Sequence, residues 1–564
     1  MFRTRFLLAA LCLLSALALS TTAQPVTKQL APGVVLTQEI DTNPQSPLIV
    51  NCVSLDLTDP QVDIKAAIGK DVVYVDDAAK GRETISSLTS RRGALVGVNA
   101  DFFPFTGDPL GVCIIDGEIV SEPPGNRAAV AITSDRAAFL DTPSLNATLT
   151  TSGGAARVID GINRSRETNQ IVLYTQAFGA STRNQFKSVD LVCASTDLPV
   201  RAGKPIKLTV TEIKCDAADT PIPAGGVVVS GGGAAAAFLA ANVKVGDTIT
   251  ARFDIKSPNG LDWTSVRQAV GGGPWLLRDS KVWIDTVAEG FSLAGFERAK
   301  HPRTAIGLTA DRKLLLVTVD GRQTISGGIN LPDLAALMKR LGAVSAINLD
   351  GGGSTTLSVK GIVVNAPCEG DERPVADALL VFAPEQACEA ASMLALAGVP
   401  AEVVSGQGSP LQLTCGPDAR PLTQDQLRNV VWGTTKGVGF VNQSGYFTPI
   451  KARNGTVNAI YGAQVLSAAV SVSAGPPAKL VAELAADKEN PLRSTLKVMA
   501  LDMNANPVPA KEVLLNITGG KSDLESGTTD DKGEFTTGIT WDQAATDRLA
   551  AAIVGDLSAE ARPK

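Results

Sequence analysis

One segment of this 564-residue chain has the pattern of a well-formed amphipathic helix. In residues 331–341, LPDLAALMKRL, apolar residues recur at i, i+3, i+4 and i+7, which places Leu334, Leu337, Met338 and Leu341 on one helical face. The other regular patterns before about residue 385 are strand-like apolar runs bounded by turn residues. These runs are residues 48–57, 111–120, 205–213, 247–255, 313–319 and 378–382. We therefore predict a mixed α+β, β-rich domain with few helices at residues 24–385.

The sequence changes in character after about residue 386. Short alternating strands follow one another between turns, and residues 474–477, Ala-Gly-Pro-Pro, are a candidate linker. Beyond this linker, the D-x-N-x-N-P-V-P turn of residues 502–509 and the D-x-x-G-x-x-T pattern of residues 530–536 resemble the bacterial Ig-like repeats of invasin- and intimin-type surface proteins. We therefore predict a β-sandwich domain at residues 386–474 and an Ig-like sandwich at residues 475–564.

A single histidine, His301, restricts the chemistry that the chain can perform. A zinc site built on two histidines is excluded, and so is any mechanism that needs two imidazoles. The formal net charge is −6, with 51 Lys and Arg against 57 Asp and Glu. This balance lacks the basic character of a general nucleic-acid binder, so no nucleic acid is expected as a partner. Catalysis must rest mainly on carboxylates, arginines, hydroxyls and backbone dipoles.

Residues 1–23 have the pattern of a secretory signal peptide. Arg3 and Arg5 precede an apolar run at residues 6–19, and small residues follow at positions 21–23. No later stretch is long and apolar enough to span a bilayer. We therefore expect a protein that is secreted, periplasmic or at the cell surface.

The cysteines fit an oxidising compartment, where some of them should pair. Proximity in the sequence suggests the pairs Cys193–Cys215 and Cys388–Cys415, although the sequence alone leaves the connectivity open.

The richest set of candidate functional residues lies between residues 301 and 361. An apolar strand at residues 346–349 is followed by an acid, three glycines and a serine: Asp350, Gly351, Gly352, Gly353 and Ser354. Glycines let a backbone approach a ligand closely, and consecutive N–H groups in such a turn bind anions. A carboxylate beside this turn can act as nucleophile, general base or cation ligand. For the glycine run taken alone, a plain hairpin turn is the alternative.

Two further groups of polar residues complete the candidate site. Arg303 and Thr304 offer a guanidinium and a hydroxyl, a pair that suits a phosphate. Asn99, Asp101 and Phe102 offer an amide, a carboxylate and an aromatic face, which together could line a sugar pocket. The alternative for the phenylalanine is an ordinary place in the hydrophobic core.

The sequence gives no positive sign of a cofactor or metal. A Gly-rich turn at residues 231–236 has the G-x-G-x-x-A spacing of a dinucleotide site, but no run of βαβ units surrounds it, so a tight strand-to-helix turn is favoured. No Cys-x-x-Cys and no EF-hand spacing occurs. We therefore predict no cofactor and no metal site, while carboxylate and backbone oxygens leave a divalent cation such as Ca²⁺ compatible with the chain.

These segments, in this order, resemble the phosphodiester glycosidase family over about residues 48–385. The resemblance is strongest at HPRTAIG (301–307), TVDGRQ (318–323), the stretch from GINLPD to SVKG (328–361) and RPVADALLVF (373–382). The chain departs from the family where Ala100 and Asp101 replace a common glycine pair after Asn99. This family includes the N-acetylglucosamine-1-phosphodiester glycosidase that uncovers lysosomal signals, together with many exported bacterial proteins.

The resemblance implies a hydrolase that cleaves a sugar-1-phosphodiester, releases the sugar and leaves a phosphomonoester. Asp350 would be the nucleophile or base, and Arg303 would hold the phosphate with help from Thr304 and Ser354. Asp320 and Arg322 are second candidates for the carboxylate and the cation, and His301 would donate a proton or only cap a turn. The residues assigned to substrate binding are Asn99, Asp101, Phe102, Thr304, Arg322, Asn348, Gly351, Gly352, Gly353 and Ser354.

Two other functions remain open at the level of sequence. The chain could be a non-catalytic protein that binds exopolysaccharide or cell wall, or an adhesin whose front domain only displays a surface. In either case the Ig-like tail would act as a spacer or contact the cell wall. The catalytic hypothesis requires Asp350, Arg303, Asn99 and Asp101 to converge in space.

Overall fold

The computed structural model describes residues 24–104, 106–291, 295–385 and 393–563. The predicted signal peptide, residues 1–23, lies outside the described residues. In the described part, most of the regular structure is strand, and there are four α-helices. They are α1 (Ile85–Arg91), α2 (Gly233–Asn242), α3 (Leu331–Arg340) and α4 (Gln424–Leu427). The β-rich fold with few helices is confirmed.

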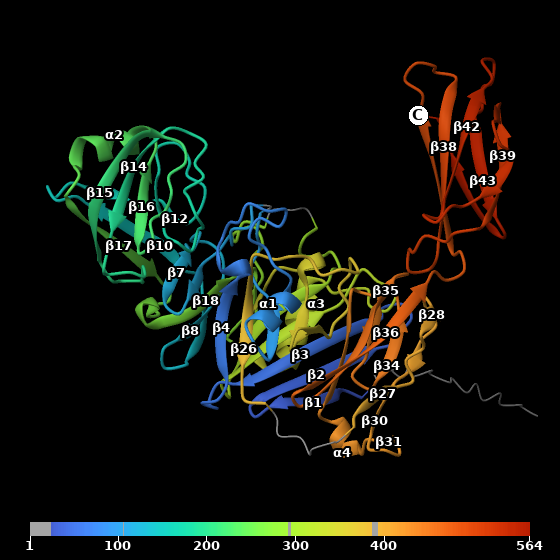
Figure 1. Cartoon of the computed structure of the whole chain (residues 1–564), viewed down its shortest axis with the longest axis horizontal. Helices are drawn as coiled ribbons and strands as arrows, with labels where there is room; N and C mark the ends of the chain where they lie inside the picture. Colours follow the sequence, from blue (N-terminus) through green and yellow to red (C-terminus); the bar gives the residue numbers. More distant parts are fainter. Residues whose placement is uncertain (1–23, 105, 292–294, 386–392, 564) are drawn as a thin grey trace, which may run out of the picture.

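Two large sheets pack face to face in the centre of the molecule (Figure 1). The first has the strand order β1 (Val26–Ala31), β2 (Val34–Asp41), β3 (Leu48–Asp56), β22 (Lys313–Val319), β21 (Arg303–Thr309), β23 (Ala343–Asn348), β19 (Trp275–Arg278) and β20 (Lys281–Val282). The second has the order β28 (Glu402–Val404), β36 (Gln464–Ser473), β35 (Asn454–Tyr461), β32 (Val430–Thr435), β25 (Ile362–Val363), β24 (Leu357–Val359), β5 (Val96–Asn99), β26 (Asp377–Phe382) and β4 (Asp63–Ile68). This second sheet joins strands from both sides of residue 385 through the pairing of Val363 with Thr434.

Each central sheet is covered by one helix on its outer face. Helix α3 packs Leu334 and Met338 against the first sheet, and α1 packs Ile85 and Leu88 against the second. Strands that are buried on both faces need continuous apolar runs, which explains the sequence KLLLVTV of β22. The predicted helix at residues 331–341 is confirmed, and the side chain of Asn330 caps it by accepting a hydrogen bond from the Asp333 N–H at 2.8 Å.

A third body is inserted between β5 and β19 of the central sheets. A five-stranded sheet leads into it, with the order β7 (Glu118–Ser121), β6 (Cys113–Ile115), β18 (Val266–Gly271), β8 (Ala129–Thr133) and β9 (Ala138–Asp141). The predicted strand at residues 111–120 is in fact the hairpin β6–β7, because Asp116 and Gly117 both adopt positive φ and reverse the chain there. An eight-stranded sheet follows, in the order β11 (Ala156–Val158), β10 (Ser144–Thr150), β17 (Thr248–Lys256), β15 (Ile206–Ala217), β14 (Ser188–Ala194), β16 (Gly226–Gly231), β13 (Ile171–Tyr174) and β12 (Gly161–Ile162).

The predicted disulfide Cys193–Cys215 is wrong. Both cysteines are free, because the pairing of β14 with β15 places Cys193 opposite Val210 and Cys215 opposite Val189. Cys193 is buried and Cys215 is exposed. The second predicted pair includes Cys388, which lies outside the described residues.

The chain after residue 393 continues the second central sheet and then forms a separate sandwich. Two small sheets accompany β32, β35 and β36, namely β27 (Ala395–Ala397), β30 (Gln412–Cys415) and β31 (Arg420–Pro421), and β29 (Ser409–Pro410), β34 (Tyr446–Pro449) and β33 (Gly439–Val441). The terminal sandwich packs the sheet β37 (Lys479–Ala486), β38 (Arg493–Leu501), β42 (Glu534–Trp541), β40 (Gly520–Ser522) against the sheet β41 (Ser526–Thr528), β39 (Glu512–Thr518), β43 (Leu549–Val554), β44 (Leu557–Ala561). This two-sheet architecture confirms the predicted Ig-like sandwich at the end of the chain.

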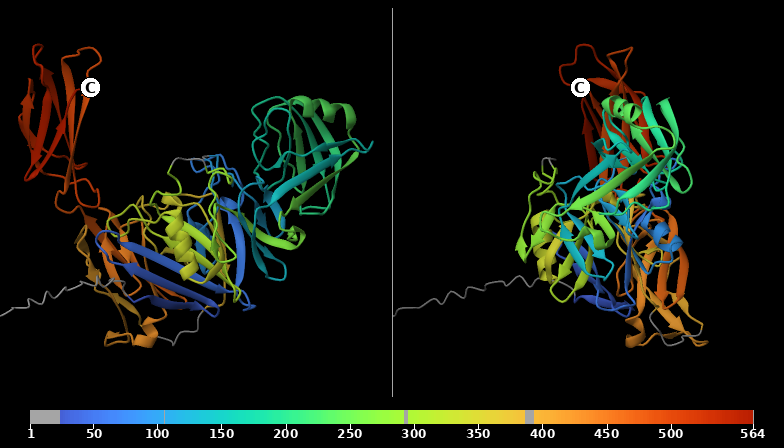
Figure 2. Two further views of the ribbon diagram at one scale, coloured as in Figure 1. Left: turned by 180° about the vertical axis from the view of Figure 1, so that it is seen from behind. Right: turned by 90° about the vertical axis from the view of Figure 1, so that its left-hand side faces the viewer.

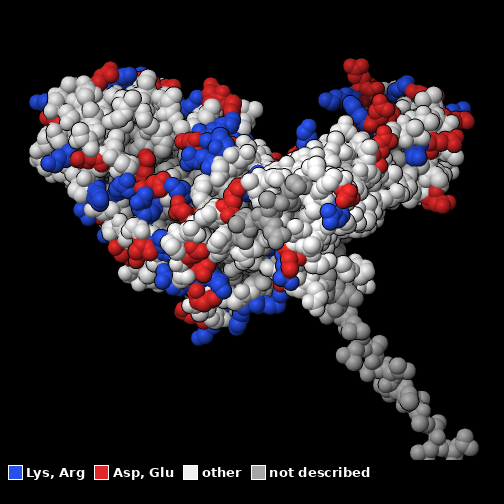
Figure 3. All heavy atoms as spheres, turned by 60° about the horizontal axis from the view of Figure 1, so that its bottom comes forward, with Lys and Arg blue, Asp and Glu red and all other residues white. Residues whose placement is uncertain are grey.

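The terminal sandwich and the inserted body project from opposite ends of the central sheets (Figure 2). The D-x-N-x-N turn of residues 502–506 lies where the terminal sandwich meets the segment before it. There the Asp502 carboxylate accepts hydrogen bonds from the N–H groups of Gly475, Asn504 and Asn506. Charged side chains of both signs are interspersed over the face that Figure 3 shows. None of the helices formed by the described residues is long and apolar enough to cross a membrane.

Candidate active site

The glycine run 351–353 lies where the chain crosses from the first central sheet to the second. It connects the end of β23 to the start of β24, with a short 3-10 turn over Gly352–Ser354. The backbone of Asp350 is tied to the second sheet by its N–H, which donates to the Ala100 carbonyl at 2.9 Å. The N–H of Gly352 donates to the Pro302 carbonyl at 2.9 Å, which ties the turn to the first sheet. The crossing therefore brings both sheets to one point.

Glycine is required at this crossing for steric reasons. A Cβ on Gly351 would lie 2.7 Å from the Pro302 carbonyl oxygen, and Gly352 has a φ of +61°. A Cβ on Gly353 would lie 2.3 Å from both the Arg373 guanidinium and the Glu369 carboxylate. The requirement is strict at Gly351, which meets backbone, and at Gly352, which has positive φ, while the flexible side chains beside Gly353 could move aside.

The carboxyl group of Asp350 stands at the start of this turn and has an altered acidity. Burial raises the pKa of Asp350 to about 6, against the opposing effects of the Ser354 hydroxyl, the Gly351 N–H and the positive charge of Arg373. The Gly351 N–H donates to Oδ1 of Asp350 at 2.9 Å. The residue as a whole is partly exposed, although its carboxyl group is buried enough for its pKa to rise. A carboxylate with this pKa is ionised at neutral pH and still basic enough to accept a proton.

Asn99 holds the backbone of the crossing in place. Its Nδ2 donates to the Asp350 carbonyl at 2.7 Å, and its Oδ1 accepts from the Thr304 hydroxyl at 2.8 Å and from the Thr356 N–H at 3.2 Å. Asn99 and Thr304 are fully buried. These hydrogen bonds are all with protein groups, and they fix the glycine turn against both sheets.

Asn348 plays a similar part on the other side of the turn. It is fully buried, and its Nδ2 donates to the carbonyls of Gly273 at 2.9 Å and Leu349 at 2.7 Å. Its Oδ1 makes no hydrogen bond to any described residue. The glycine turn at residues 271–273 is therefore packed directly under the candidate site.

Two more carboxyl groups lie buried beside Asp350. The Asp101 carboxylate accepts from the N–H groups of Phe102 at 2.8 Å and Gly111 at 2.5 Å, and Oδ1 of Asp377 accepts from the Asp101 N–H at 2.8 Å. Burial raises the pKa of Asp101 to about 7, and burial together with the charge of Asp101 raises the pKa of Asp377 well above its usual range. Like charges in one buried cluster disfavour simultaneous ionisation. Asp377 was assigned no role from the sequence, although it lies within the RPVADALLVF motif.

Four arginines surround the crossing, and they differ in how freely they can reach a ligand. Arg303 is 2% exposed, and its guanidinium donates to the carbonyls of Phe296, Ala299 and Ile329. Burial and the charge of Arg322 lower the pKa of Arg303 to about 10. Arg322, in contrast, is exposed, and its terminal nitrogens would lie 3.2 Å from a Cβ on Gly352. Of these two, Arg322 is thus the better placed to contact an anion.

The other two arginines, Arg127 and Arg373, were not identified from the sequence. The Arg127 guanidinium lies 4.6 Å from the Phe291 ring centre and 5.7 Å from that of Phe102. Nη1 of Arg127 is buried and makes no hydrogen bond to any described residue. Phe291 in turn stacks on Phe296 at 5.2 Å, beneath Arg303. Nothing in the local sequence around Arg127 or Phe291 marks them, because the loops that carry them meet only in the fold.

His301 contacts one of these arginines. Nε of Arg322 donates to Nδ1 of His301 at 3.3 Å, and the backbone of His301 is bridged to Ile329. Burial and the charges of Arg322 and Arg303 lower the pKa of His301 below its usual value. The imidazole is therefore neutral at neutral pH and accepts a hydrogen bond at Nδ1.

Asp320 is set apart from the other candidates. It is fully buried, and its carboxylate accepts from Nδ2 of Asn365 at 2.8 Å and from the Ala366 N–H at 3.0 Å. Burial raises the pKa of Asp320 to about 7. These contacts tie the end of β22 to the strand pair β24–β25. Its catalytic role stays a prediction.

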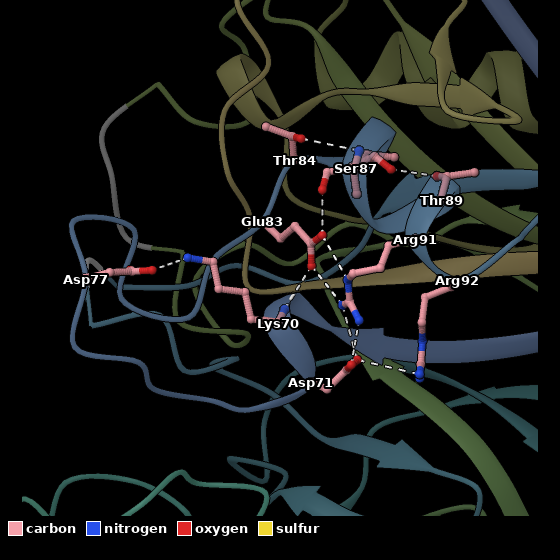
Figure 4. A network of polar contacts seen from close by, with 10 residues as sticks. Lys70, Asp71, Asp77, Glu83, Thr84, Ser87, Thr89, Arg91 and Arg92 are labelled. Carbon is pink, nitrogen blue, oxygen red and sulfur yellow. Dashed lines mark hydrogen bonds and ion pairs between the residues drawn. The ribbon is translucent and has the colours of Figure 1, made fainter.

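A network of charged residues supports the loop in front of α1 (Figure 4). Glu83 accepts from the Lys70 N–H at 2.9 Å, the Ser87 hydroxyl at 2.7 Å and the Arg91 guanidinium at 2.9 Å. Arg91 also pairs with Asp71, which has a positive φ. The loop at residues 70–83 presses on the segment that follows Asp101, since a Cβ on Gly107 would lie 2.3 Å from the Lys80 carbonyl.

Among the described residues, no three side chains of the His, Cys, Asp and Glu types gather closely enough to hold a metal ion. The buried carboxyl groups accept backbone N–H donors instead, as Asp101 and Asp320 show.

The comparisons with known proteins agree with the motifs in the sequence. Residues 206–382 match the sequence profile of the phosphodiester glycosidase family. The chain is 38% identical over 119 residues to the SPbeta prophage-derived uncharacterized protein YomE of Bacillus subtilis, which covers 21% of this chain and 18% of that protein. It is 36% identical over 110 residues to the human N-acetylglucosamine-1-phosphodiester alpha-N-acetylglucosaminidase, which covers 18% of this chain and 21% of the enzyme. The chain thus spans about a fifth of the length of these curated relatives.

The fold also has a counterpart among solved structures. A hypothetical protein from Synechocystis superimposes with a TM-score of 0.53 at 24% identity, over 64% of each chain. The profile match includes β21, α3, β23 and the glycine run, which are the elements that build the candidate site. The resemblance predicted from the sequence is therefore confirmed, and residues 206–382 carry the phosphodiester glycosidase family signature.

Proposed function

We propose that this chain is an exported hydrolase that cleaves a sugar-1-phosphodiester in a cell-envelope or extracellular glycan. The reaction takes up one water, breaks the bond between the anomeric carbon and the phosphate oxygen, and yields the free sugar, a phosphomonoester and one proton. The family match supports the reaction class. The observation that carries the proposal is Asp350, a carboxyl group whose pKa burial raises to about 6 and which stands beside a glycine turn and several arginines.

In this proposal Asp350 faces the anomeric carbon as nucleophile or general base. A phosphodiester is a good leaving group, so the site needs mainly to stabilise the negative charge on the departing phosphate. Arg322 and Arg373 supply that charge from the two sides of the glycine turn, near Gly352 and Gly353. The buried Arg303 adds a fixed positive charge, because three carbonyls already hold its guanidinium.

The remaining predicted residues position this machinery. Asn99 and Thr304 fix the backbone of Asp350, and Asn348 fixes the strand that precedes it. Asp101 shapes the buried wall behind Asp350. The partly exposed ring of Phe102 offers aromatic surface for a sugar face, and the buried Phe291, with its ring centre 5.1 Å away, packs behind it. In this proposal the Phe102 ring and the glycine turn contact the sugar. The buried amide of Asn99 and carboxyl group of Asp101 act through the backbone groups that they bind.

The test is hydrolysis of a methyl phosphodiester of α-N-acetylglucosamine 1-phosphate in ¹⁸O-labelled water. The expected result is label in the released sugar, because the anomeric carbon is attacked. Asp350→Asn should reduce the rate at least about 10²-fold while circular dichroism and the thermal transition stay unchanged. Label in the phosphate would show phosphodiesterase chemistry, and an unchanged rate in the variant would remove Asp350 from the mechanism.

A non-catalytic glycan-binding protein or adhesin is the second candidate. The terminal sandwich supports it, because a separate domain of this kind can act as a spacer between a cell surface and the rest of the molecule. It would be favoured if wild-type protein bound sugar phosphodiesters without releasing any product.

A further inference from the structure

A cavity of about 320 Å³ lies beside the candidate active site and is not used by the chemistry described above. On one side it is bordered by the start of α1 and the loop at residues 367–372, which belong to the segment before residue 385. On the other side it is bordered by the end of β32 and the turn that follows it, which come from the segment after residue 393. Its size is at the lower end of the range of about 300–1,000 Å³ typical of small-molecule sites.

Close backbone contact fixes the two walls of this cavity relative to each other. A Cβ on Gly437 would lie 1.7 Å from the Gly370 carbonyl oxygen, so the β32–β33 turn rests directly on the loop. Arg453 of the later segment also forms an ion pair with Asp371 of the loop. The cavity therefore exists only because the chain after residue 393 packs on the family-matching segment.

The lining of the cavity is rich in hydrogen-bonding groups. The Glu372 carboxylate accepts from the N–H of Ser86 at 2.9 Å and from its hydroxyl, and burial raises the pKa of Glu372. The Thr435 hydroxyl pairs with that of Thr456 at 2.7 Å and keeps further bonding capacity. Lys436 is the cation on the lining, against the two carboxylates of Asp371 and Glu372. This balance favours a neutral ligand with several hydroxyls over an anionic one.

The same loop connects the cavity to the glycine turn. Residues Gly370, Asp371 and Glu372 face the cavity, while their neighbours Glu369 and Arg373 pair with each other beside Gly353. Arg373 also helps to hold down the pKa of Asp350. One loop thus forms the wall between the cavity and the point where a phosphodiester would be cleaved.

We propose that this cavity binds a neutral polyhydroxylated unit, a sugar ring or an alditol, that follows the scissile phosphodiester in the same substrate. The inference rests on the proposed hydrolytic function for the identity of the substrate chain. The segment after residue 393 then has a defined role, because it completes a binding site for the part of the glycan that remains after cleavage.

The decisive experiment compares substrates with a short and a long aglycone in the full chain. Thr435→Trp places an indole in the cavity, and Thr456→Trp is the matched control, since it breaks the same hydroxyl pair from a position outside the lining. With an N-acetylglucosamine-1-phosphodiester of ribitol or of cellobiose, Thr435→Trp should raise KM about tenfold at unchanged kcat. With the methyl phosphodiester, neither variant should differ from the wild type.

Binding without hydrolysis separates this inference from the proposed function. Ribitol, cellobiose and glucuronate are titrated into wild type, Glu372→Gln and Thr456→Trp, with saturation-transfer NMR as the readout. Signal from ribitol or cellobiose that is lost in Glu372→Gln, kept in Thr456→Trp and absent for glucuronate supports the site, even if the chain proves to hydrolyse nothing. Absence of signal from both neutral ligands in the wild type, or equal KM values for Thr435→Trp and Thr456→Trp on long substrates, overturns it.

Discussion

Nε of Arg322 donates a hydrogen bond to Nδ1 of His301 at 3.3 Å, so the one histidine of the chain orients an exposed arginine beside the glycine turn. His301 must be neutral to accept this bond, and its lowered pKa keeps it so. His301 is thus a positioning residue for Arg322 in the proposed mechanism. Substitution by glutamine and by leucine separates that role from proton transfer.

His301→Gln should retain activity within about threefold, because the amide oxygen of glutamine can accept from Arg322. His301→Leu removes the acceptor and should raise KM for a sugar phosphodiester about tenfold, which corresponds to about 1.4 kcal/mol for one lost hydrogen bond. Steady-state kinetics at pH 7.5 measure both effects. A large loss of kcat in His301→Gln would instead assign proton transfer to the imidazole.

The activity should depend on the ionisation of Asp350. Its pKa is raised to about 6, and the proposed mechanism needs the carboxylate, so kcat/KM should fall tenfold for each pH unit below about pH 6. The measurement is a pH profile between pH 4.5 and 8. His301→Gln should keep this acid limb in place, and a limb that disappears in that variant would assign it to the histidine.

Asp320 should make the protein less stable as the pH rises. Its pKa in the folded state is about 7, above the value of about 3.9 for an unfolded chain, so the folded state holds a proton that the unfolded state releases. The contribution to stability is present below about pH 4 and is lost as the pH rises through about 7, at up to about 1.4 kcal/mol per pH unit. Asp320→Asn should therefore flatten the fall in thermal midpoint between pH 5 and 8. Parallel curves for wild type and variant would contradict the buried, protonated state.

Loss of the Asn99 side chain should reduce both stability and activity. Asn99→Ala leaves the Asp350 carbonyl, the Thr304 hydroxyl and the Thr356 N–H without their partner, at about 1–3 kcal/mol for each buried group. A drop in thermal midpoint of several degrees together with reduced kcat is expected. The control is Asn146→Ala on the exposed face of β10, which should change neither quantity.

The orientation of the terminal sandwich should depend on Asn504. Its Oδ1 accepts from the Thr324 hydroxyl at 2.8 Å, and its Nδ2 donates to the Ser405 hydroxyl at 2.9 Å, so it joins the sandwich to two other segments. Asn504→Ala should widen the distribution of maximum dimensions in small-angle X-ray scattering. Asn516→Ala, an exposed position on β39, serves as the control, and identical scattering of all three proteins would show that Asn504 does not hold the junction.

Local patterns predicted much of the fold because they depend on neighbours in the chain. The 3.6-residue period of residues 331–341 specifies α3 without reference to the rest of the molecule. The strand-like runs at residues 48–57, 313–319 and 378–382 were confirmed as β3, β22 and β26, because strands buried on both faces need continuous apolar sequence. The short helix α1 was missed, since seven residues give a weak periodic signal, while the strand-to-helix turn favoured at residues 231–236 is the junction of β16 and α2.

Distances across the sheets could not be predicted in this way. Cys193 and Cys215 are close in sequence, but the register of two long strands keeps them apart. Arg127 comes from a different part of the chain than Arg373 and Asp377, which lie just before and at the start of β26, and no local pattern marks them as partners of Asp350.

The sequence by itself determined the β-rich class, the single strong helix, the glycine turn after Asp350 and the family signature. Each of these depends on residues that are contiguous in the chain. The tertiary structure decided which groups are free to act. Burial and hydrogen bonding between sheets commit Asn99, Asp101 and Arg303 to the protein, while the crossing of the chain from one sheet to the other leaves Asp350 and Arg322 within reach of a ligand.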